Sequence, residues 1–198
     1  MSTTNSGLTL VLASSSRYRR ELLDRLKLPF QIVSPDVDET PHSGEAPAIT
    51  AGRLALAKAQ AAHPRYPRSL IIGSDQVAFC DGVRLDKPGD HAGAVRQLRH
   101  ASGKSVNFIT AIALVNTASG RSQTKLVPTE VRFRQISDHE IERYLQAEPA
   151  YDCAGSAKAE GLGISLIESI RSTDPTALIG LPLIALCEML RNEAVSVP

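Results

Sequence analysis

Three serines and two arginines form the first group of side chains that could do chemistry. Ser14, Ser15 and Ser16 follow a short apolar run and come just before Arg19 and Arg20. The unpaired N–H groups at a helix N-terminus attract anions, and hydroxyl and guanidinium groups can complete such a site. This segment could therefore hold the phosphates of a nucleotide. The serines alone would also fit an ordinary helix N-cap, but the arginine pair favours phosphate binding.

Carboxylates at two other places could hold a metal ion and activate a water molecule. Glu39 ends the acidic cluster 36–39, where loop carboxylates would suit Mg²⁺ or Mn²⁺, although such a loop is more often simply solvated. Asp75 lies in the sequence GSDQ at 73–76. Its carboxylate could orient a metal-bound water or accept its proton for attack on phosphorus. The alternative is an aspartate that caps a turn.

Basic side chains and a glycine-rich segment complete the set. Lys58 lies in an expected helix, where a single lysine is usually a surface residue. Lys87 could neutralise phosphate charge. The segment 154–163, AGSAKAEGLG, carries Lys158 and Glu160, and its glycines would permit close backbone approach. It fits neither the Walker A pattern nor the dinucleotide fingerprint, which disfavours a kinase or P-loop NTPase.

Short apolar strands and amphipathic helices must position these residues. The serines follow the first expected strand and Asp75 follows the third, and in open α/β sheets ligands gather at such strand ends. We expect one α/β folding unit over 1–198, with residues 1–7 flexible, because the chain is short for two separate cores. Strands are expected at 8–13, 30–33, 70–73, 106–116, 125–135 and 162–170, and helices at 18–28, 48–62, 90–101, 137–147 and 182–193.

Composition and charge limit the kinds of partner that the protein is expected to bind. The net charge is +1, from 22 basic and 21 acidic residues, and no basic stripe is interleaved with aromatic residues, so stable nucleic-acid binding is not expected. Three widely spaced cysteines favour a reducing compartment over a disulfide scaffold. No export signal is apparent, and the longest apolar runs fall well short of the roughly 20 residues that span a bilayer. We therefore expect a soluble, cytoplasmic protein without a membrane partner.

Taken together and in this order, the segments LASSSRYRRELL, VDET, LALAKA, GSDQV, LDKP and AGSAKAEGLGI resemble the Maf family of nucleoside triphosphate pyrophosphatases. The resemblance runs from about Leu8 to Arg191. It implies an α/β fold with a mixed, twisted sheet and two lobes flanking a cleft, similar to inosine triphosphate pyrophosphatases. It also implies a homodimer, a divalent cation (Mg²⁺ or Mn²⁺), and hydrolysis of a nucleoside triphosphate to a monophosphate and pyrophosphate, in a house-cleaning role.

Within the family, GSDQV and the glycine-rich segment look like the branch that acts on 7-methyl-GTP. The resemblance makes Asp75 the catalytic carboxylate. Asp86 stands where the family usually has glycine, which puts the role of the neighbouring Lys87 in question. The implied roles are substrate specificity for Tyr18, Gln76 and Glu160, phosphate binding for Ser14, Ser16, Arg19, Arg20, Lys58, Lys87 and Lys158, and metal binding for Glu39 and Asp75.

Two alternatives remain open from the sequence. One is a pyrophosphatase of the same family that acts on dTTP and UTP or has broad specificity. The other is a nucleotide-binding inhibitor of septum formation without catalysis. A panel of substrates would distinguish the first alternative from a 7-methyl-GTP pyrophosphatase. An assay of pyrophosphate release would distinguish the second alternative from any pyrophosphatase.

Overall fold

The structure is a computed structural model that describes residues 7–198. The segment expected to be flexible, 1–7, therefore lies outside the described residues except for Gly7. The strands are β1 (Thr9–Ala13), β2 (Phe30–Val33), β3 (Ser69–Cys80), β4 (Val83–Arg84), β5 (Ser105–Asn116), β6 (Ser122–Phe133) and β7 (Ile167–Ser172). The α-helices are α1 (Arg17–Asp24), α2 (Pro47–Ala62), α3 (His91–Ala101), α4 (Asp138–Ala147) and α5 (Leu183–Asn192).

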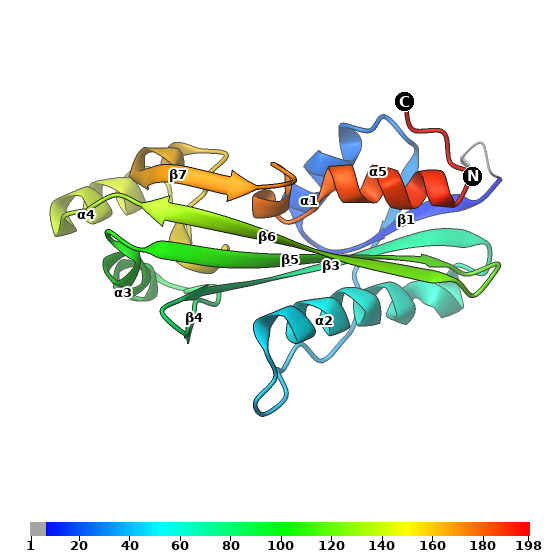
Figure 1. Cartoon of the computed structure of the whole chain (residues 1–198), viewed down its shortest axis with the longest axis horizontal. Coiled ribbons are helices and arrows are strands. Elements are labelled where there is room, and N and C mark those ends of the chain that lie inside the picture. Colours follow the sequence, from blue (N-terminus) through cyan, green and yellow to red (C-terminus); the bar gives the residue numbers. More distant parts are fainter. Residues whose placement is uncertain (1–6) are drawn as a thin grey trace. The chain divides into compact units, whose positions relative to one another are not determined.

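The strands form one mixed sheet, which confirms the expected α/β class. Their order is β2-β1-β3-β5-β6-β7, with β4 paired to β3 (Figure 1). β1 pairs in parallel with both β2 and β3, whereas β4 is antiparallel to β3 and β7 is antiparallel to β6. No helix within 7–198 is long and apolar enough to cross a membrane.

The chain divides into two compact units. The first contains residues up to 76, 110–127 and 174–198, and the second contains 77–109 and 128–173. The long strands β3, β5 and β6 each contribute residues to both units. Whether the two units unfold together stays a prediction.

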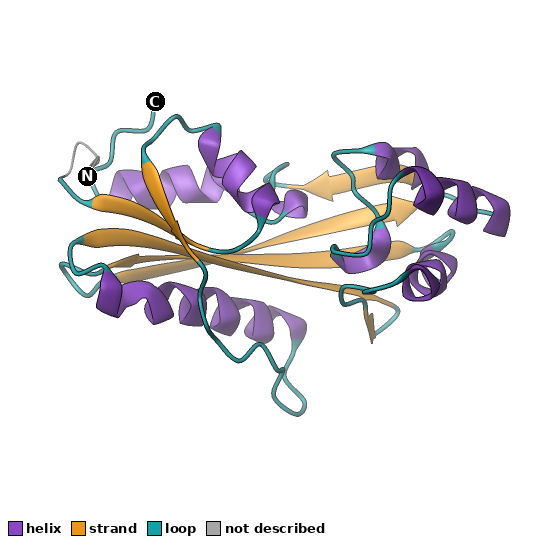
Figure 2. Cartoon of the chain, turned by 180° about the vertical axis from the view of Figure 1, so that it is seen from behind, coloured by secondary structure: helices purple, strands orange, loops and turns teal. Residues whose placement is uncertain are grey.

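In the first unit, helices cover both faces of the sheet (Figure 2). Successive residues of a strand point to opposite faces, so Leu10 and Leu12 pack on one side and Val11 and Ala13 on the other. The first side carries leucines of α1 and α5, including Leu22 and Leu186, in a large aliphatic core. The second side is covered by the alanine-rich α2.

A glycine in β3 allows α2 to lie unusually close to the sheet. A Cβ atom at Gly73 would clash with the carbonyl oxygen of Ala55 and would lie 2.8 Å from the backbone nitrogen of Ala59. The helix side that faces it is lined by alanines, so backbone approaches backbone. This close approach sets the depth at which the next inward residue of the helix, Lys58, meets the strand.

The second unit contains β4, α3, α4 and β7. Asp90 caps α3 by accepting a hydrogen bond from the backbone N–H of Gly93 at 2.7 Å. A capping box opens α4, where Ser137 and Glu140 bind each other's backbone N–H groups. α3 packs against α4 and against the short turn 154–156.

The structure corrects three of the expected element boundaries. β3 continues to Cys80, so Asp75 lies within a strand and not at its carboxyl end. The strand can continue because Ser74 and Asp75 find buried polar partners. α1 ends at Asp24, not at residue 28, because the backbone N–H groups of residues 25–27 bond to carbonyl oxygens only three residues back and Lys27 leaves helical geometry with a φ of 55°.

The third correction concerns the expected strand 162–170. Residues Leu162–Leu166 form a 3₁₀ helix, and strand β7 begins only at Ile167. The backbone N–H of Gly163 donates to Glu148 Oε2 at 3.2 Å, so it is not available to a strand ladder.

Candidate active site

A buried lysine joins two of the predicted carboxylates. Lys58 Nζ donates to Asp75 Oδ1 at 2.7 Å and lies 3.0 Å from Glu39 Oε1. Lys58 and Asp75 are 5% and 6% exposed, whereas Glu39 reaches in from an exposed loop. The base-rate expectation that Lys58 is a surface residue is therefore wrong. Helix α2 places the Lys58 ammonium group next to strand β3, which carries Asp75.

The donor set suits the divalent cation that the sequence predicts. Glu39 and Asp75 supply hard oxygen atoms that converge on one positive charge, here the Lys58 ammonium group. Mg²⁺ is commonly held by one or two carboxylates together with substrate phosphates. The chemistry of these residues therefore fits such an ion, which Glu39 and Asp75 would hold.

The serine and arginine segment adjoins this cluster. Strand β1 pairs in parallel with β3 so that Ala13 lies opposite Gly73, which places Ser14 and Ser74 at neighbouring positions. Arg19 Nε donates to the carbonyl oxygen of Gly180 at 2.8 Å, and Ser74 Oγ lies 2.9 Å from the same oxygen. Gly180 thus fixes one edge of the guanidinium group.

The hydroxyl groups of Ser14 and Ser16 accept hydrogen bonds from backbone N–H groups at the start of α1. Ser16 is its N-cap, and its Oγ accepts from the backbone N–H of Arg19 at 3.4 Å. Ser14 Oγ accepts from the backbone N–H of Ser16 at 3.2 Å and lies 3.5 Å from Arg19 Nη1. Burial lowers the pKa of the Arg19 guanidinium, whereas the negative charges of Asp75 and Glu39 act to raise it. Arg19 therefore belongs to the same electrostatic cluster as Lys58.

The side chain of Gln76 is held in one orientation. Its Nε2 donates to Thr110 Oγ1 at 2.8 Å and to the carbonyl oxygens of Leu178 at 3.0 Å and Ala177 at 3.1 Å. Thr110 Oγ1 itself donates to Ala177 at 2.9 Å. Three acceptors around one atom of the side-chain amide identify that atom as the nitrogen and the other as the oxygen. The donor is therefore used internally, and the amide oxygen is the atom left to contact a ligand.

The guanidinium group of Arg17 already lies over the ring of Tyr18. The guanidinium carbon of Arg17 lies 4.7 Å from the ring centroid, and Arg17 Nη2 donates to the Tyr18 hydroxyl at 2.8 Å. A tyrosine face attracts cations through its quadrupole. Arg20 is exposed on the same helix, and the structure brings it into no contact with Asp75 or Lys58.

The other predicted residues belong to the second unit. Lys158 is half-buried: its Nζ lies 3.2 Å from Asp152 Oδ1 and its backbone N–H donates to Tyr144 Oη at 3.1 Å. Glu160 and Lys87 are exposed. Asp86, the departure from the family pattern, pairs with Arg84 at 2.6 Å and not with Lys87.

Two supporting residues have no motif and were missed by the sequence reasoning. Gln97 Nε2 donates to the carbonyl oxygen of Asp86 at 2.7 Å, and its Oε1 accepts from Ser156 Oγ at 2.7 Å. It thus ties the segment before Lys87 to the glycine-rich segment. Arg53, in the first unit, likewise connects two segments through its side chain. A glutamine or arginine in a helix carries no signal of such a partner.

Arg53 latches the acidic loop to α2. It binds Glu45 through two contacts of 2.7 Å, and its Nη2 donates to the carbonyl oxygen of Thr40 at 3.2 Å, one residue after Glu39. The hydrogen bonds from Arg53 lower the pKa of Glu45 to about 2. The latch therefore positions the loop that carries a predicted metal ligand.

We expect the contribution of this latch to folding stability to fade in acid. The folded-state pKa of Glu45 lies below its ordinary value of 4.5, so the contribution is fully present above pH 4.5 and is lost as pH falls toward about 2. The difference in urea midpoint between the wild type and Glu45→Gln should accordingly shrink across this window. Glu21→Gln on α1 serves as the control. A difference that stays constant down to pH 2 would contradict the assignment.

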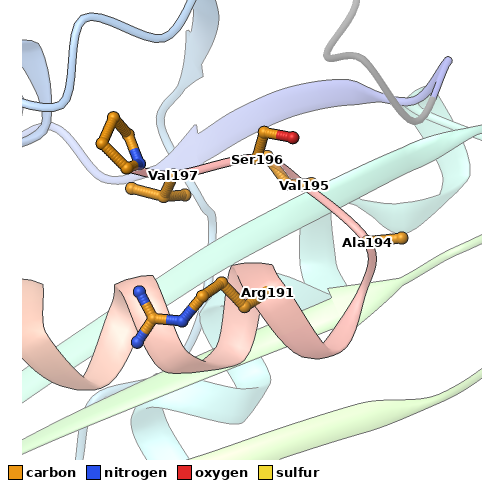
Figure 3. Close-up of a pocket in the computed structure, with 6 residues that line it drawn as sticks. Arg191, Ala194, Val195, Ser196 and Val197 are labelled. Carbon is orange, nitrogen blue, oxygen red and sulfur yellow. The ribbon is translucent and has the colours of Figure 1, made fainter.

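A hollow in the first unit contains none of the predicted site residues. It measures about 490 Å³ and is lined by Arg191 and residues 194–198, where the chain turns back after α5 (Figure 3). Val195 and Val197 are buried in the aliphatic core beneath. One charged side chain and an apolar tail do not make a triphosphate site.

Comparison with known proteins agrees with the motif order. Residues 9–193 match the family described as "Maf-like protein". Proteins named 7-methyl-GTP pyrophosphatase are similar over nearly the whole chain. One from Polaromonas sp. is 57% identical over 94% of this chain and 85% of its own length. One from Thiobacillus denitrificans is 55% identical over 98% and 96%, and one from Albidiferax ferrireducens is 54% identical over 95% and 94%.

Proposed function

Because this chain belongs to the Maf family, we propose that it hydrolyses nucleoside triphosphates between the α- and β-phosphates and that its preferred substrate is 7-methyl-GTP. The observation that carries the reaction is the convergence of Glu39 and Asp75 on the buried ammonium group of Lys58. Such an arrangement combines metal-binding oxygens with a fixed positive charge. The names of the relatives support the choice of substrate.

Asp75 is the residue that we assign to the attacking water. Lys58 binds its Oδ1, so Oδ2 is the atom that would orient the water and accept its proton. The short Lys58 contact fixes the carboxylate in place. A divalent cation held by Glu39 and Asp75 would neutralise phosphate charge and make the water a better nucleophile.

The triphosphate would be held at the start of α1. The half-buried Arg19 guanidinium, fixed by Gly180, and the hydroxyl groups of Ser14 and Ser16 would offer a bound phosphate a fixed charge and fixed hydrogen-bond donors. Lys58 adds a second cation. Arg20, Lys87 and Lys158 are assigned to the phosphates from their motifs alone.

The proposed base preference rests on the chemistry of 7-methylguanine, which is a cation with N–H donors on its edge. The Tyr18 ring, which already holds the Arg17 guanidinium, is suited to a cationic ring. Gln76 would accept from the guanine edge with its amide oxygen, because its nitrogen is occupied. Glu160 is assigned to the base from the branch resemblance.

The test is a pyrophosphate-release assay with Mg²⁺ or Mn²⁺ over 7-methyl-GTP, GTP, dTTP, UTP and CTP. We expect the highest kcat/KM for 7-methyl-GTP. Preference for dTTP and UTP would keep the reaction and overturn the substrate. Absence of turnover with every nucleotide would overturn the reaction and favour the nucleotide-binding septum inhibitor.

Variants of the base contacts sharpen this test. A hydrogen bond to a charged group contributes about 1.5–3 kcal/mol, so Gln76→Ala and Glu160→Ala should each reduce the preference for 7-methyl-GTP over dTTP by about 10–100-fold. Glu168→Ala, an exposed acid on β7, is the matched control. An unchanged preference in Glu160→Ala would remove that residue from the site.

We further propose that the protein is a cytoplasmic homodimer that removes modified nucleotides before their incorporation into nucleic acid. These assignments rest on the resemblance to the family. Light scattering of the purified chain would decide the oligomeric state.

A further inference from the structure

Three side chains of different metal-binding chemistry meet at the end of β3. Cys80 is its last residue, Asp81 begins the turn to β4, and His100 lies in the last turn of α3. One ligand atom from each lies within 4.8 Å of the other two. All three residues belong to the second unit. None of them takes part in the proposed pyrophosphatase chemistry.

We propose that Cys80, Asp81 and His100 form a binding site for a zinc ion. Thiolate sulfur, imidazole nitrogen and carboxylate oxygen are the three ligand types that zinc takes in proteins, at about 2.0–2.3 Å from the metal. Mg²⁺ and Mn²⁺ prefer oxygen ligands, so this site differs in chemistry from the one at Glu39 and Asp75. Three protein ligands leave one tetrahedral position for water.

The surroundings of His100 favour a metal ligand. Its Nε2 lies 3.2 Å from the backbone carbonyl oxygen of Cys80. A carbonyl oxygen can only accept, so Nε2 carries the proton, and Nδ1 is left with a lone pair. A metal-binding histidine usually donates its other ring N–H to such a group, which fixes its tautomer and orientation.

Asp81 can complete the site by a small movement. It lies in an exposed turn with Gly82 and has a φ of 49°, and its carboxylate is bound to Lys104 Nζ at 3.0 Å. Lys104 is the basic group that faces the cluster, and a zinc ion would compete with its ammonium group for the carboxylate. Cys80, in contrast, is fully buried and fixed by the strand. The ion would therefore bind at the inner side of the turn.

A bound zinc ion would link the β3–β4 turn to the end of α3. Segments far apart in sequence would then share one metal, which stabilises the folded state by mass action if the unfolded chain binds it less well. The turn also leads into β4 and the segment that carries Lys87. The inference does not depend on the proposed hydrolytic function.

Cobalt provides a direct probe, because Co²⁺ replaces Zn²⁺ and reports a thiolate ligand by a charge-transfer band in the near ultraviolet. We expect one equivalent of Co²⁺ to give this band in the full-length, untagged chain and zinc to remove it. Cys80→Ser should abolish the band, and Cys153→Ser and Cys187→Ser should retain it. The proposal fails if the wild type gives no band or if Cys80→Ser leaves it unchanged.

Two further variants keep the test decisive if Cys80→Ser does not fold. His100→Asn should weaken zinc binding by more than the roughly 10–100-fold that loss of an outer-shell partner costs. Lys104→Met keeps all three ligands and removes the competing cation, so zinc affinity should rise several-fold. An unchanged or lower affinity in Lys104→Met, or an unchanged affinity in His100→Asn, would overturn the site. The measurement is competition with a chromophoric chelator.

Discussion

Replacing Asp75 by asparagine is expected to lower the rate of pyrophosphate release by about 10²–10⁴-fold, the usual contribution of a general base. Asparagine keeps the size of the side chain and can still accept from Lys58. It cannot accept a proton from water, and a neutral amide is a weaker ligand for a divalent cation. The measurement is kcat with saturating 7-methyl-GTP and Mn²⁺.

Asp36→Asn is the matched control, because Asp36 is an exposed acid in the same loop as Glu39. It should retain nearly full activity. Thermal unfolding of both variants separates chemistry from folding. If Asp75→Asn were folded and still retained more than about a tenth of the wild-type kcat, Asp75 would not be the group that activates water.

Replacing Lys58 by methionine is expected to destabilise the fold as well as to lower activity. Removing one partner of a buried ion pair costs about 3–5 kcal/mol, because the remaining charge stays buried without a partner. Asp75 is 6% exposed and would be left in this state. Urea unfolding of Lys58→Met against the wild type measures the loss.

The double variant Lys58→Met/Asp75→Asn tests the cause of that loss. It removes both charges, so it should be more stable than Lys58→Met alone. A double variant less stable than Lys58→Met would show that the lysine stabilises the fold by packing and not by pairing with Asp75. Lys125→Met removes a lysine from an exposed ion pair with Glu188 and should cost less than about 1 kcal/mol.

The features of the fold that depend on local sequence could be predicted. Short apolar runs and amphipathic stripes place most of the strands and helices, and Ser137 followed by Glu140 three residues later marks the start of α4. The end of β3 could not be predicted in this way. Ser74 and Asp75 look like the start of a loop, and only their buried partners, Ala111 and Lys58, allow the strand to continue.

The candidate site also combines features that local sequence predicts with features that depend on long-range contacts. The order of the motifs predicts Asp75, Glu39 and Lys58 as site residues, but it does not predict that one ammonium group binds both carboxylates. That contact depends on the packing of α2 on β3, which is a long-range property. Arg53 and Gln97 act through partners in other segments, so no local pattern could reveal them.

Gly73 affects how mutational data on this protein should be interpreted. Any side chain there would push α2 away from β3 and move Lys58 from Asp75, although Gly73 has no functional group of its own. A saturation screen scored only by enzyme activity would therefore rank Gly73 together with the charged residues. A parallel screen of protein abundance, in which Gly73 variants fall further than Asp75→Asn, where Lys58 keeps Glu39 as a partner, would distinguish a spacing requirement from chemistry.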